Sequence, residues 1–275
     1  MLKRVRVVLV LLLIVVGFGV YITTTSKSLF FSGARDLLIR ATVIGVVLGS
    51  VRSVIKNKPR IIDGNITRHD AGSFLSHWGT ATGIFLLIAS GIIMGFFPPS
   101  SRVLIDMLFG VNLHYLGLVI TLLCGFFWAA DFILSRGYKE LIPNARDIIY
   151  GTIGKYLLRR KWNYEGKYLS SQKSAFLAFA FIGFAIFVTG VIKVSAYVWP
   201  ISTSIHTIVT YIHDLFSIFF ILLLIMHVAI VIMLRHWLAF RSFFTGKIPE
   251  EYVKDEFPLW YDELVKDHKN DENKQ

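Results

Sequence analysis

Four histidines lie inside or at the edge of strongly apolar stretches, where an ionisable side chain is costly. They are His77, His114, His213 and His227. A polar group held in hydrocarbon usually has a function, and imidazole is a good ligand for several transition metals. His213 and His227 are 14 residues apart, so on a helix they share one face about 21 Å apart along the axis. Any one of them alone could simply be bonded to a neighbouring helix, but the set of four indicates a shared role.

Membrane-spanning helices are the elements that must position these histidines. The chain has 275 residues, of which 55% are hydrophobic, and a mean hydropathy of +0.61. Several apolar runs approach the ~20 residues that a helix needs to cross a bilayer. The six runs are residues 7–22, 37–54, 74–97, 113–134, 175–192 and 205–234. Lipid offers backbone groups no partners, so the runs predict helices and not the shorter, alternating strands of a barrel.

The predicted fold is an all-α integral membrane protein with about six spans. A four-helix transmembrane bundle would occupy residues 65–240, preceded by an accessory hydrophobic hairpin within residues 1–64 and followed by a charged cytoplasmic tail, residues 241–275. The first run could instead be a signal peptide, although no small-x-small cleavage site follows it. Arg40 weakens the second run as a span, unless its side chain snorkels to the outer interface.

The distribution of basic residues predicts the orientation. The net charge is +11, and the segment 136–173 alone carries nine Lys and Arg. The connections 98–112 and 193–204 hold one basic residue each. The positive-inside rule therefore places the segment 136–173 and the C-terminus in the cytoplasm. Because the basic residues gather between spans, the charge does not indicate nucleic-acid binding.

This orientation assigns each histidine a depth. His77 begins its span on the cytoplasmic side and His114 begins the next on the outer side, while His213 lies in the outer part of the last span and His227 deeper. Depth therefore pairs His77 with His227 and His114 with His213. Two such pairs suit two haem irons, because a porphyrin in an apolar helical bundle needs two axial ligands from facing helices.

Small residues near the histidines admit two interpretations. Gly83 and Gly117 follow His77 and His114, and Ser217 lies one turn after His213. They could let a porphyrin approach the backbone, or they could serve close helix packing alone. The single cysteine, Cys124, lies within a span, and the chain has no Cys-x-x-Cys-His motif. Any haem would therefore be b-type.

Other polar residues near the spans have weaker claims. His206 and His236 compete as ligands, but both are interpreted as interfacial; His69 and His268 lie in polar segments. Three further ionisable side chains are Asp131, Lys193 and Asp214. The first two fit solvated span ends. Asp214 follows His213 directly, and a role in a proton path or a bond to a haem edge stays open.

Several stretches resemble one protein family in order along the chain. They are SHWGTATGIFLLIASGI, NLHYLGLVI, EGKYLSSQKSAF, VTGVI, YIHDLFSIFFILLLIMH and GKIPEEYVKDEFPLWYDEL. Together they resemble the cytochrome b (gamma) subunit of membrane-bound formate dehydrogenases, a dihaem four-helix cytochrome b family. The likeness covers roughly residues 65–265, so the accessory hairpin lies outside it.

The resemblance implies a respiratory electron-transfer subunit that performs no formate chemistry itself. The four matching histidines would ligate two haem b groups: His77 and His227 the cytoplasmic-side iron, His114 and His213 the periplasmic-side iron. Electrons would come from a periplasmic molybdenum or tungsten catalytic (alpha) subunit through an iron–sulfur (beta) subunit. They would leave to menaquinone or ubiquinone. The location implied is the bacterial or archaeal cytoplasmic (inner) membrane.

The resemblance also implies a quinone site near the haem ligand His227. Its candidate residues are Gly166, Lys167, Tyr168, Ser170, Ser171 and Gln172. This chain departs from the family there, because Leu169 replaces a typical asparagine that would bond a quinone carbonyl. A donor from the serines or the glutamine could substitute.

Two alternatives stay open from the sequence. The same kind of subunit could serve a hydrogenase or another molybdopterin oxidoreductase. A haem-free transporter or anchor is the other, although transporters often have helices broken at mid-membrane. Here Pro98, Pro99 and Pro200 lie at span ends.

Overall fold

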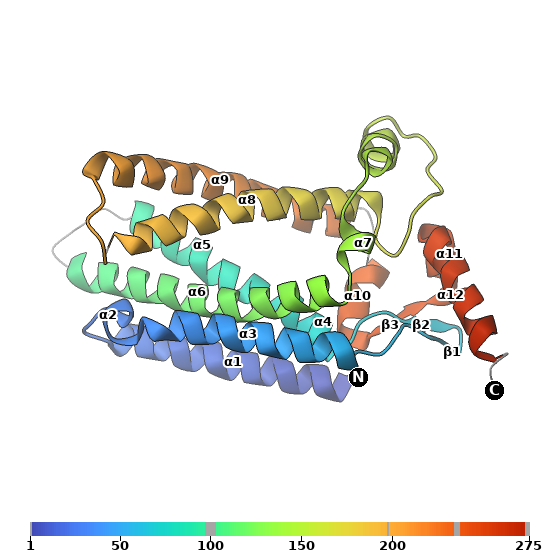
Figure 1. The fold of residues 1–275 in the computed structure, drawn as a ribbon, viewed down its shortest axis with the longest axis horizontal. Coiled ribbons are helices and arrows are strands. Elements are labelled where there is room, and N and C mark those ends of the chain that lie inside the picture. The colour runs from blue at the N-terminus through green and yellow to red at the C-terminus, as the bar shows by residue number, and fades with distance from the viewer. Residues whose placement is uncertain (1, 97–102, 197, 234–236, 273–275) are drawn as a thin grey trace. The chain divides into compact units, whose positions relative to one another are not determined.

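The structure is a computed structural model that describes residues 2–96, 103–196, 198–233 and 237–272 (Figure 1). Its contacts divide the chain into two compact units, each described by itself. The first unit comprises Met1–Tyr138 with Ala239–Pro249, and the second comprises Lys139–Leu238 with Glu250–Gln275. The division of the chain at residues 64 and 240 stays a prediction.

The first unit holds most of the N-terminal helices and a small sheet. Its elements are α1 (Leu2–Thr25), α2 (Phe30–Ala34), α3 (Asp36–Ile55), β1 (Ile61–Ile62), β2 (Asn65–Thr67), α4 (Ala71–Phe74), the π-helical turn η1 (Leu75–Gly79), α5 (Thr80–Phe96), α6 (Val103–Leu134), most of α10 (Trp237–Thr245) and β3 (Lys247–Pro249). The second unit holds α7 (Tyr138–Leu141), η2 (Asp147–Leu157), α8 (Ser170–Ser195), α9 (Thr203–Met233), α11 (Glu250–Glu256) and α12 (Pro258–Glu272).

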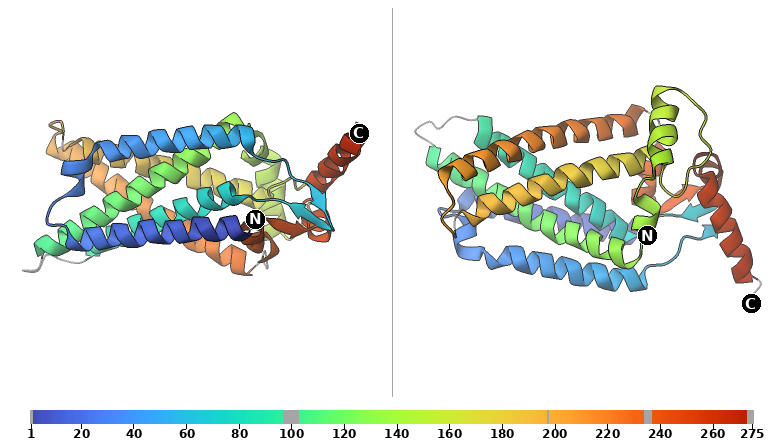
Figure 2. Two further views of the ribbon diagram at one scale, coloured as in Figure 1. Left: turned by 90° about the horizontal axis from the view of Figure 1, so that it is seen from below. Right: turned by 45° about the horizontal axis from the view of Figure 1, so that its top comes forward.

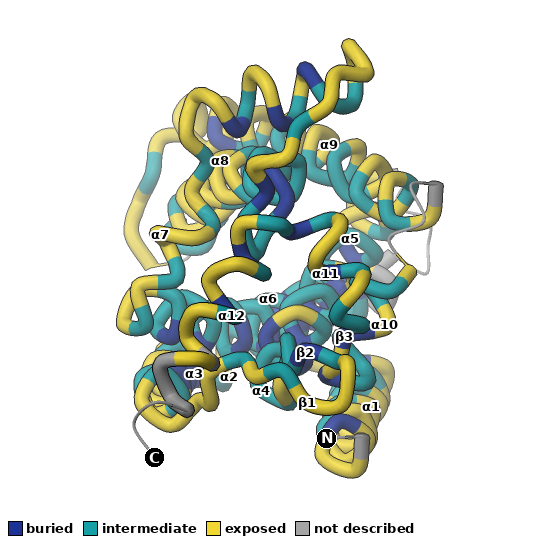
Figure 3. The backbone as a smooth tube through the Cα atoms, turned by 90° about the vertical axis from the view of Figure 1, so that its right-hand side faces the viewer, coloured by how far each residue is buried: buried dark blue, intermediate teal, exposed yellow. Residues whose placement is uncertain are grey.

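Within the described residues, six helical segments are long and apolar enough to cross a membrane. They are Lys3–Thr25, Asp36–Ile55, Ala71–Gly95, Met107–Leu134, Ser170–Ser195 and Thr203–Ile232. Many apolar side chains along them are exposed, and the yellow stretches of α8 and α9 mark exposed residues (Figure 3). Exposed apolar faces of this extent fit lipid as the surrounding solvent. The predicted all-α integral membrane fold is confirmed.

The accessory helix α3 packs along α6 more closely than its polar start suggests. Its buried residues are Ala41, Gly45 and Gly49, which recur every four positions and so form one stripe. A Cβ placed on Gly45 or Gly49 would collide with the backbone of α6. Small residues at this spacing let two membrane helices approach to backbone contact, and α3 runs beside α6 in both views of Figure 2.

Helix α6 begins at Val103, ten residues before the predicted start of the span at residue 113. Asn112, the last residue of the connection predicted at 98–112, is buried in the helix. Its amide donates to the carbonyl of Ser28 and accepts from the backbone N–H of Phe30, each at 2.9 Å. The asparagine therefore ties α6 to the turn before α2.

Asp131 contradicts its predicted role as a solvated span end. Its carboxylate is buried near the end of α6, where it pairs with Arg52, and with Lys56 at 3.0 Å, both from α3. Arg52 also reaches Asp70 at 2.7 Å and Ser73 at 2.9 Å. Asp70 caps α4 by accepting from the Ser73 N–H. The sequence could not show this network, because its partners lie on a helix that was expected to be peripheral.

A three-stranded antiparallel sheet of order β1-β2-β3 closes one end of the first unit. Asp63 and Gly64, both with positive φ, form the turn between β1 and β2, which is the usual chemistry of a two-residue hairpin. β2 then pairs with β3, so that Ile66 lies opposite Ile248. Both isoleucines are fully buried.

In the second unit, α8 starts on a buried acid. Ser170 is fully buried, and its backbone N–H and hydroxyl both donate to Glu165, at 2.6 and 2.9 Å. Burial raises the pKa of the Glu165 carboxyl above 4.5. Lys173, one turn further along α8, pairs with Asp147 of η2 at 3.1 Å. These contacts fix the position of α8 against η2.

Candidate functional site

The structure divides the four predicted ligands equally between the two units. His77 in η1 and His114 in α6 belong to the first unit, and His213 and His227 in α9 belong to the second. His77 is exposed and the other three are half-buried. The predicted pairings each join one unit to the other, and they stay predictions. Of the rivals, His206 is exposed near the start of α9, and His236 lies outside the described residues.

His114 is held by a hydroxyl from the neighbouring helix. Its Nδ1 lies 2.9 Å from Oγ of Ser90 on α5. Ser90 is fully buried, and its hydroxyl also lies 2.7 Å from the carbonyl oxygen of Leu86, one turn earlier. A hydroxyl has a single proton, and a carbonyl can only accept it. The imidazole must therefore donate its Nδ1–H to Ser90.

His213 has the same arrangement in the second unit. Its Nδ1 lies 2.9 Å from Oγ1 of Thr189 on α8, and the threonine hydroxyl lies 2.7 Å from the carbonyl of Ala185. The sequence separation from hydroxyl to histidine is 24 residues in both units. Gly190 follows Thr189, and a methyl group there would contact the His213 ring at 3.5 Å. In a neutral imidazole, an Nδ1–H directed at the hydroxyl leaves the lone pair on Nε2.

His77 is held by aromatic rings. Its imidazole stacks on Phe243 with ring centroids 4.8 Å apart, and it meets the next residue, Trp78, edge to face at 5.2 Å. The other side of the stack is His69, whose centroid is 4.1 Å from that of Phe243. His69, interpreted from the sequence as a residue of a polar segment, therefore belongs to the surroundings of His77.

His227 contacts Phe179 of α8, at 5.7 Å between ring centroids and nearly perpendicular. No hydrogen bond holds its ring among the residues that the structure describes. Phe179 places an apolar ring and no charge beside this imidazole. Neutral imidazole is the form that binds a metal.

The predicted small residues separate into two kinds. Gly83 and Gly117 face one another across α5 and α6: a Cβ on either would lie 2.9 Å from the carbonyl oxygen of the other. They serve close helix packing, one of the two interpretations left open by the sequence. Ser217 donates to the carbonyl of His213 at 2.7 Å, which satisfies its hydroxyl within α9.

The predicted quinone residues all lie in the second unit, at the start of α8 and the segment before it. Several are engaged by the protein: Lys167 pairs with Glu140 at 2.7 Å, Ser171 donates to the Tyr156 hydroxyl at 3.2 Å, and the Gln172 side chain accepts from the Leu169 N–H at 3.1 Å. Ser170 is bonded to Glu165, while Gly166 and Tyr168 complete the stretch. Leu169 is buried as the N-cap of α8.

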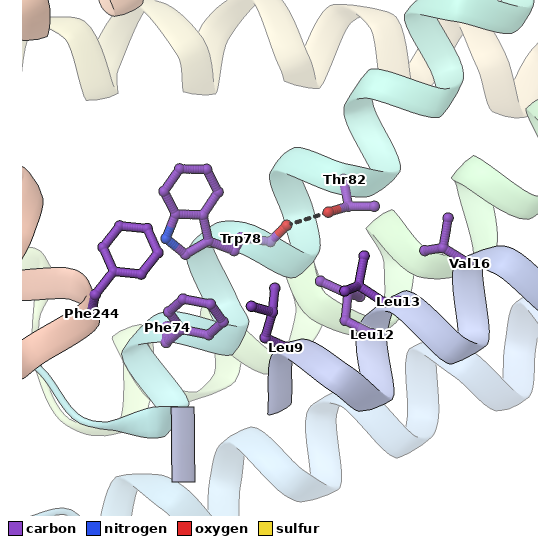
Figure 4. A pocket seen from close by; sticks show the side chains of 8 residues that line it. All are labelled: Leu9, Leu12, Leu13, Val16, Phe74, Trp78, Thr82 and Phe244. Atoms are coloured by element: carbon purple, nitrogen blue, oxygen red, sulfur yellow. Dashed lines mark hydrogen bonds between the residues drawn. The ribbon is translucent and has the colours of Figure 1, made fainter. Parts of the chain in front are cut away.

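An apolar pocket of about 270 Å³ lies beside Trp78 in the first unit (Figure 4). Side chains of α1 form one wall, and Trp78 and Phe244 form part of another. Thr82 turns its hydroxyl to the Trp78 carbonyl at 2.8 Å, so it offers the pocket little polarity. Helix α1 therefore covers Trp78, the residue after His77, with apolar side chains.

The donor set fits haem iron. No three His, Cys, Asp or Glu side chains gather into a metal cluster in the described part of the chain, whereas a haem needs only two axial imidazoles. An imidazole whose Nδ1 bonds a hydroxyl, as in His114 and His213, would bind iron through Nε2. Residues 77, 114, 213 and 227 would hold such groups, which supply one-electron transfer when bound.

The hydroxyl partners Ser90 and Thr189 were missed by the sequence analysis. A signal was present: each residue is followed by glycine, in SGI and TGVI, and each precedes a histidine by 24 residues. Hydropathy does not reveal it, because a single serine or threonine in an apolar helix commonly bonds its own backbone.

Comparison with known proteins gives the family. No curated protein matches this chain. A family model described as prokaryotic cytochrome b561 matches residues 68–246. The match covers more than half of the chain and includes all four predicted ligands. Proteins of this family are membrane cytochromes that bind b-type haem and transfer electrons. The chain belongs to the prokaryotic cytochrome b561 family.

Proposed function

We propose that this cytochrome is the membrane anchor and electron-transfer subunit of a formate-dehydrogenase-type complex. It would take electrons from a periplasmic catalytic and iron–sulfur pair of subunits and deliver them through two b haems to membrane quinone. Family membership supports the membrane cytochrome. The resemblance of six stretches to the formate dehydrogenase subunit supports the partner and the direction. The family match leaves the haem-free transporter without support.

One observation carries the proposal: His114 and His213 have the same hydroxyl partner geometry on Nδ1, at 2.9 Å in each unit. A histidine kept only for packing needs no particular tautomer. Two imidazoles from different helices that both keep Nε2 available are what a bis-histidine haem requires. The depth argument from the sequence supports His77 and His227 as the second pair.

The orientation proposed from loop charge gives the reaction a direction. With the segment 136–173 and the C-terminus in the cytoplasm, the haem held by His114 and His213 lies nearer the periplasm. The haem held by His77 and His227 lies nearer the cytoplasm. Electrons would move inward, and quinone reduced near His227 would take protons from the cytoplasm, which charges the membrane.

The proposed quinone site at residues 166–172 rests on the resemblance. Ser170 and Gln172 are used by the start of α8, and Ser171 bonds Tyr156. A quinone would therefore compete with these hydrogen bonds or with the ion pair of Lys167 and Glu140, or would bond Tyr168. One of these groups would take the place of the asparagine amide that is missing because this chain has Leu169 there.

Haem stoichiometry tests the proposal. The protein purified in detergent is expected to hold two haems. His213→Ala and His114→Ala should each lose one haem, and the lost spectral component should be the same in both variants. His206→Ala is the matched control on α9 and should keep both. One haem or none in the unchanged protein would overturn the two-haem proposal.

The partner needs a separate experiment. Deletion of the gene should abolish formate-dependent quinone reduction by membranes while formate oxidation with a soluble acceptor persists. Co-purification of molybdenum or tungsten and iron–sulfur subunits would support the complex. Loss of hydrogen-dependent quinone reduction instead would assign the subunit to a hydrogenase.

A further inference from the structure

Ser90 and Thr189 do more than fill space in their helices. Each is buried, each lies on the helix preceding a proposed ligand, and each has one hydrogen-bond contact to that ligand. Each also donates its only proton to its own helix backbone, at 2.7 Å. The oxygen lone pair that remains can only accept. The arrangement is thus directional, from imidazole to hydroxyl.

We infer that Ser90 and Thr189 are positioning residues that fix the tautomer of His114 and His213 and lower the reduction potential of the haem they bind. The inference rests on the proposed function. It adds two residues to which no role has been assigned. It also adds a direction to their effect.

The direction follows from ligand basicity. An imidazole that donates Nδ1–H gains electron density, which makes Nε2 a stronger ligand. A more basic axial ligand stabilises the oxidised iron over the reduced iron, so second-shell hydrogen bonding is one of the protein's means of setting a haem potential. Two such bonds, one on each axial ligand, act in the same sense.

The effect is selective for one haem. His227, proposed for the other haem, has an aromatic neighbour and no hydrogen bond to its ring among the described residues. The hydroxyls lie on α5 and α8 next to His114 and His213 only. A change at Ser90 or Thr189 should therefore move one redox component and leave the other in place.

The apolar surroundings strengthen the argument. An Nδ1–H left without a partner inside a membrane span costs free energy, so removal of the hydroxyl also frees the ring to rotate or change tautomer. The protein avoids that cost with the shortest polar side chains available. Each is satisfied within its own helix and adds no charge.

The experiment is a potentiometric titration of the purified holoprotein, followed at the haem absorption bands. Ser90→Ala and Thr189→Val remove the hydroxyls, and Thr189→Val keeps the side-chain volume. Each is expected to raise the midpoint potential of the component that His114→Ala and His213→Ala lose, with two haems retained. Ser90→Thr and Thr189→Ser keep a hydroxyl and should restore the original value.

Ser195→Ala is the matched control, since the Ser195 hydroxyl on α8 donates to the carbonyl of Ile192 in the same helix, at 2.8 Å. It should leave both potentials unchanged. Low-temperature electron paramagnetic resonance gives a second measurement: the largest g value of one low-spin haem should shift in the hydroxyl-free variants. If a variant loses that haem, restoration of the haem by the hydroxyl-retaining variant supports the positioning role.

The outcomes separate the two proposals. Unchanged potentials and g values in Ser90→Ala and Thr189→Val, with two haems present, overturn the inference and leave the proposed function intact. Shifts in two different components support the hydroxyl effect but contradict the pairing of His114 with His213. Fewer than two haems in the unchanged protein contradicts the proposed function itself.

Discussion

Glu165 shows how one buried residue can make stability depend on pH. It is nearly inaccessible to solvent, and its carboxylate receives both donors of Ser170. Burial disfavours the ionised form and raises the pKa, against the opposing effects of Ser170, Lys155 and Lys173. The folded protein therefore binds this proton more tightly than the unfolded chain does.

The consequence is a loss of stability with rising pH. The contribution of Glu165 is fully present below the unfolded pKa of about 4.5 and is lost as pH rises through the higher folded pKa. Thermal melting of the detergent-purified protein should show this fall as the pH is raised above the unfolded pKa. In Glu165→Gln, which cannot titrate, the fall should be absent. A melting curve equally pH-dependent in both proteins would contradict the assignment.

In the hydroxyl–imidazole pairs, the sequence predicted one partner and not the other. The histidines were found because charge-bearing residues are rare in apolar runs. Their partners were not, because serine and threonine have no such rarity, and only the neighbouring helix shows which hydroxyl meets which ring. The burial of Asp131 was missed for the same reason: its partners Arg52 and Lys56 lie 79 and 75 residues away in sequence.

At the scale of elements, the contact between α3 and α6 depends on glycine. Hydropathy predicted most of the long helices to within about five residues at each end, because a bilayer dictates their length. It placed the start of α6 ten residues too late. Their neighbours were not predicted, since packing in lipid depends on shape rather than on apolar character. The stripe of Ala41, Gly45 and Gly49 is the feature that identifies the packed face of α3.

Gly49→Leu should separate the two helices. The added side chain has the α6 backbone in its way, so relief requires movement of a whole helix, at a cost of at least ~1–3 kcal/mol. The melting temperature and the yield of folded protein should both fall. Gly17→Leu is the control on α1, because nothing lies within 4 Å of a Cβ there. Equal loss in the two variants would contradict the packing argument.

The ion pairs of α3 should differ in strength with burial. Asp131→Ala removes one of the two carboxylates that pair with the largely buried Arg52 and leaves Asp70 as the other, which should destabilise the protein by ~1–3 kcal/mol. Asp36→Ala breaks a pair with Arg40 whose side chains are 72% and 60% exposed, and should cost less than ~1 kcal/mol. Chemical denaturation of the two variants measures both. Similar losses would show that the Asp131 network lies in contact with water.

At the scale of the whole molecule, the proposed orientation can be measured with single cysteines. The chain has one cysteine, Cys124, which is buried. In a Cys124→Ala background, Ser202→Cys should react with a membrane-impermeant maleimide in intact cells. Lys161→Cys should react only after permeabilisation. The reverse pattern would invert the topology and with it the proposed direction of electron flow.

The small sheet of the first unit constrains how the chain is threaded through its bilayer. β2 precedes the first span that carries a proposed ligand and β3 follows the last, yet Asn65, Ile66 and Thr67 pair directly with residues 249, 248 and 247. Strands cannot exchange backbone hydrogen bonds through hydrocarbon, so both lie in one aqueous compartment. A chain that leaves a compartment and returns to it has crossed an even number of times. The pairing of β2 with β3 therefore requires an even number of membrane crossings between Thr67 and Lys247. An alteration that deletes one of these crossings must also break the sheet.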